Sequence, residues 1–472
     1  MSPQTQSEMN AIVARSTSST LPFGPSTPES RTHRKLQVRL LPFLFLLYVI
    51  AFIDRINIGF AALTMNKELA ITSQQFGFAA GVFFFGYFLF EVPSNLLLQK
   101  VGARIWIARI LVTWGILASL TGFVHTIHQL YIARFLLGLA EAGYFPGIVL
   151  YLTYWFRQRE RAQAVALFLT GLPVTSILGA PISGLILDHV HFLGVSSWRW
   201  LLILEGLPAI AGGIVTYFVL PNRPAEATFL SKEEKDLLQA DLLHEEKEKL
   251  EQRHYSVGEA MLNGRVLSLA IAEFGILIGS YTFYFWGPQL IKSLSNQFSN
   301  TTVGMLVMIP HLVGGVAMVL VSFSSDRRSE RRYHAGIPVF LGGIALLLLG
   351  VFHSPFTLIA LLSLLAVAAY AWTGPFFALP SEFLTGSAAA AGIGLINSIG
   401  NLGGFVGPYA MGVMSGWRGG VYGGLALMGI PMLLSATGLM LLPKRASSNS
   451  VAASRSHGLN GCKVATSVSY PK

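Results

Sequence analysis

The chain has 472 residues, of which 53% are hydrophobic and only 12% are charged, and its mean hydropathy is +0.57. Because so few polar side chains cannot cover soluble domains of this length, most of the chain is expected to face lipid. The formal net charge of +10 does not indicate a nucleic acid partner, because the basic residues cluster between long apolar runs. The single cysteine, Cys462, lies in the C-terminal tail, which excludes a disulfide framework and a cysteine-based metal site.

The N-terminal part of the chain changes character near residue 36. Residues 1–35 are rich in Ser, Thr, Pro and Gln, which predicts a disordered tail. Residues 36–222 are predicted to form a half of six spans, because each apolar run reaches the roughly 20 residues that a spanning helix needs. The runs are continuous, without the alternation of barrel strands, so a β-barrel is excluded. They lie near residues 38–62, 76–98, 105–124, 129–155, 162–187 and 200–220.

The second part of the chain repeats this arrangement after a polar linker at residues 223–264, where the charged run at 245–251 predicts a solvated helix. Residues 265–445 are predicted to form the second six-helix half, and residues 446–472 a disordered tail. The apolar runs lie near 266–291, 302–323, 335–353, 356–380, 387–414 and 421–442. The sequence therefore predicts an all-α integral membrane protein of about twelve helices, whose two halves can rock about a central site.

The basic residues predict the orientation in the membrane. With one exception, between the tenth and eleventh runs, they occupy every second loop, as at Lys100 and Arg104 and at Arg327 and Arg328. Because positively charged loops stay in the cytoplasm, both termini and the linker are expected there. The predicted location is the plasma membrane, specifically a bacterial inner membrane.

Charged residues inside the predicted spans are costly in lipid, so each one is a functional hypothesis. In the second half such residues are almost absent, because they fall toward the ends of the runs, at Glu273, Lys292, Glu382 and Arg418. In the first half they lie deep, at Asp54, Arg55, Glu91, Arg134 and Glu141. The titratable groups are therefore expected to act in the first half.

The spacing of these charges leaves two interpretations open. Arg134 and Glu141 are about two helical turns apart on one face, whereas the neighbours Asp54 and Arg55 point about 100° apart. In one interpretation Asp54 pairs with Arg134 and Arg55 with Glu141, only to hold two helices together. In the other they form an anion and proton site, in which protonation of Glu141 frees the planar fork of Arg55 for a carboxylate.

Other polar residues also allow two interpretations. Glu91 faces the cavity one turn beyond Tyr87, or it pairs with a loop arginine. Asn397 and Asn401 share a helix face and bind substrate hydroxyls or a neighbouring helix. The aromatic residues line the cavity or anchor the membrane interface, at Tyr281, Tyr284, Trp286 and Trp372. The overlapping GxxxG patterns predict close helix contact, at Gly400, Gly403, Gly404 and Gly407.

Several strings, within Leu36–Pro443, closely resemble the anion:cation symporter family of the major facilitator superfamily, and among its members the bacterial tartrate-type transporters. The most specific string is RFLLGLAEAGYFPG, at residues 134–147. The others are AFIDRINIGFA at 51–61, GY at 86–87 with EVPSN at 91–95, YWF at 154–156 and FWGPQ at 285–289.

The resemblance implies proton-coupled uptake of a small organic anion, such as tartrate or a related hydroxy, sugar or aromatic carboxylate, by alternating access. It implies that Asp54 and Glu141 carry protons and that Arg55 binds the carboxylate. The other substrate-binding candidates, the last four of lower weight, are Tyr87, Asn397, Arg134, Glu91, Asn401, Trp286 and Gln289. One departure is Phe52, which stands where some sugar-acid members carry tyrosine.

Other functions lack their sequence marks. No HExxH, GxSxG or P-loop pattern is present, so neither an enzyme, a metal or other cofactor, nor direct use of ATP is expected. No pore filter is visible, and a nutrient sensor would carry a larger soluble domain. Exchange or export of an anion by the same fold remains open. The expected partners are the anion, protons and the lipid bilayer, and the protein is expected to be a monomer.

Overall fold

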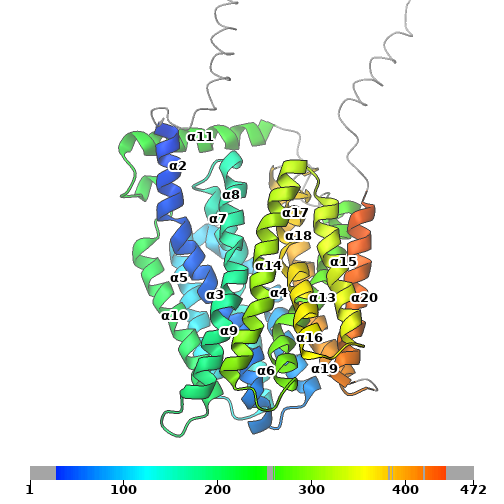
Figure 1. Ribbon diagram of the computed structural model, residues 1–472. Coiled ribbons are helices and arrows are strands. Elements are labelled where there is room, and N and C mark those ends of the chain that lie inside the picture. The colour runs from blue at the N-terminus through cyan, green and yellow to red at the C-terminus, as the bar shows by residue number, and fades with distance from the viewer. Residues whose placement is uncertain are drawn as a thin grey trace, which may run out of the picture.

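The computed structural model describes residues 28–251, 259, 261–380, 383–384, 386–417 and 420–442. Within them the regular structure is helical, which confirms the predicted fold class (Figure 1). The predicted tail was expected to reach residue 35, but a helix already begins at Pro28. Most of both predicted tails, with Cys462, lies outside the described residues, as do Glu382 and Arg418.

The first half and the linker contain the helices up to α11. The first-half helices are α2 (Pro28–Arg39), α3 (Leu41–Glu68), α4 (Ser73–Val101), α5 (Ala103–Thr121), α6 (Ile127–Glu141), α7 (Tyr144–Thr153), α8 (Gln158–Leu169), α9 (Gly171–His189) and α10 (Ser197–Val219). The linker contains the short 3-10 helix η1 (Pro224–Glu226) and α11 (Lys232–Glu251). A helix therefore covers the charged run of the linker, as predicted.

The second half begins at α13, and its helices lie beside those of the first half in Figure 1. They are α13 (Gly264–Ser293), α14 (Asn300–Arg328), α15 (Arg332–Leu349), α16 (Pro355–Tyr370), α17 (Thr373–Ala378), α18 (Gly386–Asn401), α19 (Gly403–Met414) and α20 (Gly420–Leu441). Within this half α13 packs against α18, α19 and α20, and α14 against α16.

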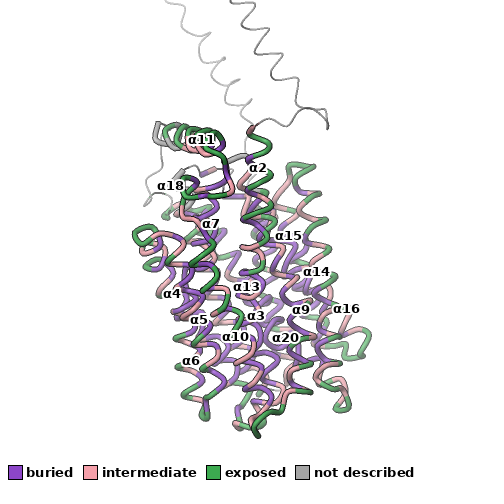
Figure 2. Tube along the Cα trace, turned by 90° about the vertical axis from the view of Figure 1, so that its left-hand side faces the viewer, coloured by how far each residue is buried: buried purple, intermediate pink, exposed green. Residues whose placement is uncertain are grey.

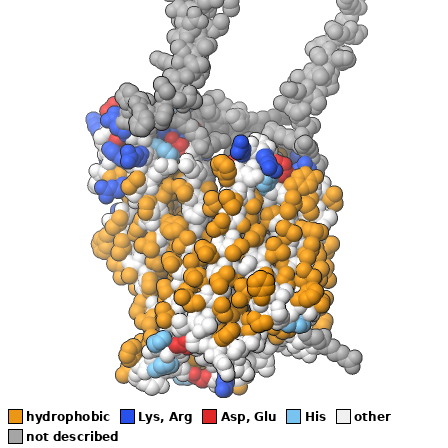
Figure 3. All heavy atoms as spheres, in the orientation of Figure 1, with side chains coloured by type: hydrophobic (Ala, Val, Ile, Leu, Met, Phe, Trp, Pro, Cys, Tyr) orange, Lys and Arg blue, Asp and Glu red, His pale blue; other side chains and the backbone are white. Residues whose placement is uncertain are grey.

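Eleven helical stretches of the described residues are long and apolar enough to cross a membrane. Their outer faces carry exposed hydrophobic side chains, such as Phe218 at 76% and Leu434 at 70% exposure, which only lipid can cover favourably. Figure 3 shows this face as a hydrophobic band, with most of its Lys and Arg side chains at the end where α2 and α11 lie. Figure 2 shows the buried residues along the inner sides of the same helices.

Four predicted spans are interrupted, and the one near 162–187 divides at Thr170 into α8 and α9. The span near 129–155 divides into α6 and α7, because Gly143 adopts φ +84°, a conformation that glycine allows and that ends α6 just after Glu141. The span near 387–414 divides at Leu402 into α18 and α19. The span near 356–380 divides after Tyr370 into α16 and α17. Broken helices within the membrane are typical of transporter binding sites.

The largest contacts between the two halves are those of α3 with α13, α4 with α19, and α9 with α14, and α4 also meets α18. The α9/α14 contact is backbone to backbone. A Cβ atom added at Gly304 would lie 2.3 Å from the carbonyl oxygen of Ala180, and one added at Gly184 would lie 2.4 Å from that of Asn300. Such close approach is possible only for glycine.

Asp188 reinforces this contact at the end of the molecule opposite α2 and α11. Its carboxylate accepts hydrogen bonds from the backbone N–H of Asn300 at 3.1 Å and of Thr301 at 2.7 Å. The side chains of these residues donate at 2.8 Å and 2.7 Å. A carboxylate of the first half therefore satisfies the N-terminus of α14 in the second, where the helix dipole favours negative charge.

Helix α11 lies across the first half at the α2 end (Figure 1). Ser231 and Glu234 form a capping box at its start, with hydrogen bonds of 3.2 Å and 2.8 Å. Lys35 of α2 donates to Glu234 at 2.8 Å, and Arg157 donates to Asp241 at 2.7 Å. Burial raises the pKa of Glu234, but the hydrogen bonds from Lys35 and Ser231 lower it more, so the net pKa is below its ordinary value.

Candidate functional site

Arg55 occupies the contact between the two halves, on α3. Its guanidinium forms an ion pair with Glu141, at the end of α6, and donates to the hydroxyl of Tyr281 on α13 at 3.3 Å. Glu141 is only 2% exposed. The cation lies 5.2–5.3 Å from three ring centroids, those of Phe52, Phe83 and Tyr87. Arg55 is therefore a largely enclosed cation, with its side chain 12% exposed, that contacts both halves and is surrounded by aromatic rings.

Asp54 points away from this cluster, as its neighbouring position predicts. Its carboxylate accepts a hydrogen bond from the indole N–H of Trp114 on α5 at 3.0 Å and from the amide of Asn57 at 3.4 Å. No ion pair with Arg134 is found among the described residues, so the predicted pairing of Asp54 with Arg134 is wrong. Packing against α5 supplies an uncharged donor instead.

Arg134, on α6, lies deep in the first half without a paired carboxylate in the described part of the chain. Its Nε donates to the carbonyl oxygen of Ala79 at 3.4 Å, and its guanidinium lies 5.1 Å from the centroid of Phe83. Its Nη2 is buried without a hydrogen-bond partner within the described ranges. An unsatisfied buried guanidinium N–H is costly and is a ready donor for an anion.

Glu91, on α4, links the halves in a way that the sequence did not predict. Its carboxylate accepts hydrogen bonds from the side chains of Asn397 at 2.7 Å and Ser398 at 2.8 Å, both on α18. The expected alternative, a loop arginine, is wrong. Asn397, a substrate-binding candidate, is therefore held by Glu91 in this conformation.

Of the remaining candidates, only Tyr87 has a contact with Arg55 among the described residues. Tyr87 contacts Arg55 through its ring. Asn401 is 6% exposed and is the last residue of α18, at the break before α19. Trp286 packs at 5.3 Å against the ring of Phe76, and neither its indole N–H nor the amide nitrogen of Gln289 has a partner within the described ranges. Tyr87 therefore contacts Arg55, whereas the Nε1–H of Trp286 and the Nε2 amide of Gln289 donate no hydrogen bond within the described residues.

Three buried titratable residues were missed or misplaced by the sequence analysis. Glu273 was expected near a span end, but it is the tenth residue of α13, 2% exposed, and packs against α18 at Gly400. Glu205, on α10, is 6% exposed and accepts from the hydroxyl of Ser183 at 2.7 Å. His311, on α14, is 4% exposed. A single polar residue barely changes the mean hydropathy of a long apolar run, so the pattern that defines a span conceals it.

The aromatic residues of α13 belong to the interior and not to the membrane interface. The rings of Tyr281 and Tyr284 lie 5.7 Å apart, and Tyr284 packs edge-on against Phe52 of α3 at 6.0 Å. Trp372 is also buried, and its indole N–H donates to the carbonyl oxygen of Ala369 at 3.0 Å. The cavity-lining interpretation therefore fits Tyr284, while Trp372 caps its own helix turn.

Comparison with known families agrees with this architecture. The family profile described as Major Facilitator Superfamily matches residues 44–408 and 269–464. The chain belongs to the major facilitator superfamily. The resemblance inferred from the sequence strings is thereby confirmed at the level of this superfamily, and so are a transport function and a non-enzymatic role.

Two bacterial relatives resemble this chain over most of their length. A protein of Agrobacterium vitis named "Putative tartrate transporter" is 44% identical over 421 residues, which cover 89% of this chain and 96% of the relative. The "metabolite transport protein NicT" of Pseudomonas putida is 40% identical over 417 residues, covering 88% of this chain and 94% of the relative.

A solved structure supports the fold alone. The xylose transporter XylE from E. coli, in a partially occluded inward-open conformation, superposes with a TM-score of 0.70 at 14% sequence identity. The match covers 86% of this chain and 98% of XylE. The superfamily match, the eleven apolar helices of the described residues and the bacterial relatives confirm a multi-pass protein of the bacterial inner membrane.

Proposed function

We propose that this major facilitator protein takes up a small organic carboxylate together with protons, by alternating exposure of a central site around Arg55. The observation that supports this function is the ion pair between Arg55 and Glu141, buried where α3, α6 and α13 meet. The name of the tartrate-type relatives supports a small carboxylate as the substrate.

The ion pair supplies a physical basis for coupling. The carboxylate of Glu141 occupies the guanidinium that a substrate carboxylate would need. An incoming anion can take over Arg55 only if Glu141 loses its charge, because an unpaired carboxylate at this depth is strongly disfavoured. Protonation of Glu141 and binding of the substrate therefore favour each other. Tyr281 of α13 accepts a hydrogen bond from Arg55, so a change of partner at Arg55 also affects a contact with the second half.

The charge balance favours a second proton. Moving a dianion such as tartrate into a negative interior costs about 2.3 kcal/mol per charge per 100 mV, so uptake of the dianion alone would be opposed. Two protons cancel the two charges. Asp54 is the second candidate carrier, because it is 1% exposed and is held by uncharged donors rather than by a cation.

Arg55→Lys tests the substrate contact in proteoliposomes that contain the full-length protein. Lysine keeps the charge but loses the planar fork, so the affinity for a labelled carboxylate such as tartrate should fall by about 1–3 kcal/mol. Arg109→Lys is the matched control, because Arg109 lies over the ring of Trp106 and away from Glu141. Unchanged binding in the Arg55 variant would remove this residue from the substrate site.

Glu141→Gln tests the proton. It should abolish uptake driven by an inward proton gradient but leave exchange of internal for external substrate, because exchange needs only the loaded carrier to reorient. The exposed Glu233→Gln on α11 serves as the control. Accumulation by the Glu141 variant equal to wild type, with unchanged pH dependence, would contradict the proposal. Substrate affinity and the amount of folded protein, measured in the same preparation, identify a folding defect.

The orientation is also a proposal, based on the basic loops and on the Lys and Arg side chains at the α2 and α11 end (Figure 3). Reporter tags at Ser2 and after Ala446 should read cytoplasmic, and a tag near Thr126, before α6, should read external. An external reading at either terminus would contradict it.

A further inference from the structure

Glu91 joins the two halves between the Arg55 cluster and the α11 end, the end of the molecule at which α2 and α11 lie (Figure 1). It is one helical turn beyond Tyr87, which contacts Arg55, and ten residues before the end of α4, or about 15 Å along the helix axis. The start of the next helix, α5, lies at the α11 end, because the backbone N–H of Arg104 donates to the side chain of Asn222, just before η1, at 3.0 Å.

Both carboxylate oxygens of Glu91 bind α18 of the second half. Oε1 accepts from the amide nitrogen of Asn397 at 2.7 Å, and Oε2 accepts from the hydroxyl of Ser398 at 2.8 Å. Glu91 is 3% exposed and Ser398 is 8% exposed. Because these groups are enclosed, they cannot exchange their hydrogen bonds for bonds to water unless the halves part. The contact therefore favours the form in which α4 and α18 lie together.

Toward the opposite end, α4 meets the second half in a different way. A Cβ atom added at Gly77 would lie 2.3 Å from the carbonyl oxygen of Pro408, and one added at Gly81 would lie 2.8 Å from that of Phe405, both on α19. There the helices touch backbone to backbone, whereas α4 and α18 are joined by polar side chains. Because the chain breaks at Leu402, α18 and α19 are separate helices, and the close packing of α19 does not hold α18 in place.

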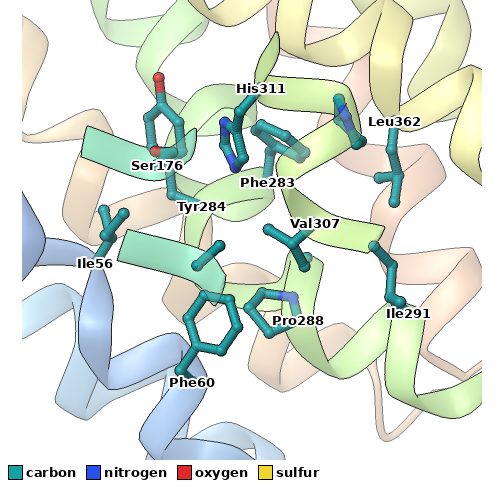
Figure 4. Close-up of a pocket in the computed structure, with 13 residues that line it drawn as sticks. Ile56, Phe60, Ser176, Phe283, Tyr284, Pro288, Ile291, Val307, His311 and Leu362 are labelled. Carbon is teal, nitrogen blue, oxygen red and sulfur yellow. The ribbon is translucent and has the colours of Figure 1, made fainter. Parts of the chain in front are cut away.

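Other polar contacts between the halves involve different helices. The hydroxyl of Tyr370, on α16, donates to Oγ of Ser176, on α9, at 3.2 Å and lies 2.7 Å from Nδ1 of His311. Ser176 and His311 line a small cavity to which both halves contribute, and Figure 4 shows its side chains. Asp188 holds the start of α14 at the end opposite α11. The halves are therefore joined by one set of hydrogen bonds at that end and by those of Glu91 toward the α11 end.

We infer that Glu91 is a gate residue, whose hydrogen bonds to α18 hold the halves together toward the α11 end and break when the central site opens there. The inference goes beyond the proposed function, because it requires only the alternating access of a major facilitator protein and neither a carboxylate nor a proton. It gives Glu91 a part in the movement of the halves, in place of the substrate contact considered from the sequence.

Spin labels at the α11 end test this gate in the full-length protein without any substrate. Cys462 is replaced by serine, and the labels are carried by the exposed positions Lys100→Cys, near the end of α4, and Arg328→Cys, at the end of α14. Glu91→Ala removes two hydrogen bonds, each of which favours the closed form by roughly 2- to 10-fold. Double electron–electron resonance should therefore show the ratio of long-distance to short-distance forms rise by roughly 4- to 100-fold.

Two milder variants and a matched control separate the gate from a folding defect. Ser398→Ala should shift the ratio by roughly 2- to 10-fold, because the bond to Asn397 remains. Glu91→Gln should shift it less than Glu91→Ala does, because the amide oxygen can still accept from Asn397. Glu91→Ala combined with Ser398→Ala should match Glu91→Ala alone, because Ser398 then has no bond left to lose. Glu273→Gln is the control, since Glu273 is also buried beside α18, at Gly400, but on α13 of the same half.

The outcomes bear on the gate alone. A wild-type distance distribution in Glu91→Ala or in Ser398→Ala would overturn the inference, and so would an equal shift in Glu273→Gln. Additive shifts of Glu91→Ala and Ser398→Ala would overturn a direct bond between the two residues. None of these measurements contains a carboxylate, whereas the Arg55→Lys and Glu141→Gln measurements depend on one, so failure of the gate and failure of the proposed function are distinguishable.

Discussion

Substitution of Gly304 by alanine should shift the equilibrium between the two access states. The added Cβ would lie 2.3 Å from the carbonyl oxygen of Ala180, well below the 3.0 Å that real Cβ contacts essentially never cross. Because the obstacle is backbone, α9 and α14 must separate by about 0.7 Å or more to relieve it. Alternating access needs these helices together in one state and apart in the other, so only the packed state is penalised.

The size of the penalty sets the expected shift. Overpacking by one methyl group in a close contact typically costs about 1–3 kcal/mol. The equilibrium should therefore move roughly 5- to 150-fold toward the state that is open at the α9/α14 end. Gly438→Ala is the matched control, because its added Cβ meets no atom within 4 Å.

Spin labels can report this shift directly. With Cys462 replaced by serine, single cysteines at the exposed loop positions Leu193 and Gln297 would carry the labels on either side of the contact. Double electron–electron resonance should show a larger long-distance population in Gly304→Ala and an unchanged distribution in Gly438→Ala. A wild-type distance distribution in Gly304→Ala, with wild-type uptake, would refute the steric reasoning.

Three further predictions follow from individual contacts. Asp188→Asn removes the charge at the N-terminus of α14 and should shift the same equilibrium in the same direction by about 0.3–1 kcal/mol, seen as a larger long-distance population of the spin labels. An unchanged distance distribution would contradict a stabilising role for the Asp188 contact. Trp114→Phe removes the donor to the enclosed carboxyl group of Asp54 and should lower thermal stability in detergent more than Trp106→Phe does, whereas equal losses would contradict a stabilising role for this hydrogen bond. The bridge from Glu234 to α2 should protect the backbone amides of α11 from hydrogen exchange while the carboxylate is ionised. Because folding lowers the pKa of Glu234, this protection, about 1 kcal/mol or less, is present above the ordinary carboxyl range and is lost as pH falls through the lowered pKa. In Glu234→Gln the pH dependence of the exchange should vanish. If it persists, the assignment to Glu234 is refuted.

The contacts of the charged residues show where sequence reasoning reached its limit. The angle between adjacent helical residues predicts that Asp54 and Arg55 diverge, and they do. It does not predict that Asp54 meets Trp114, which lies 60 positions further along the chain, instead of Arg134. Nor does it predict that Glu91 bonds to α18 rather than to a loop arginine. Such partners depend on how helices rotate and slide against one another, which local spacing leaves open.

The sequence by itself determined the membrane class, and it predicted the two halves and a site among the first-half charges. These properties depend on local quantities, namely the length of apolar runs and the rarity of charge within them. Only the tertiary structure decided that Arg55 pairs with Glu141, that spans break beside Glu141 and Tyr370, and that His311 faces a shared cavity. Those features arise where helices distant in sequence pack together, because burial and hydrogen bonding at such contacts depend on both partners at once.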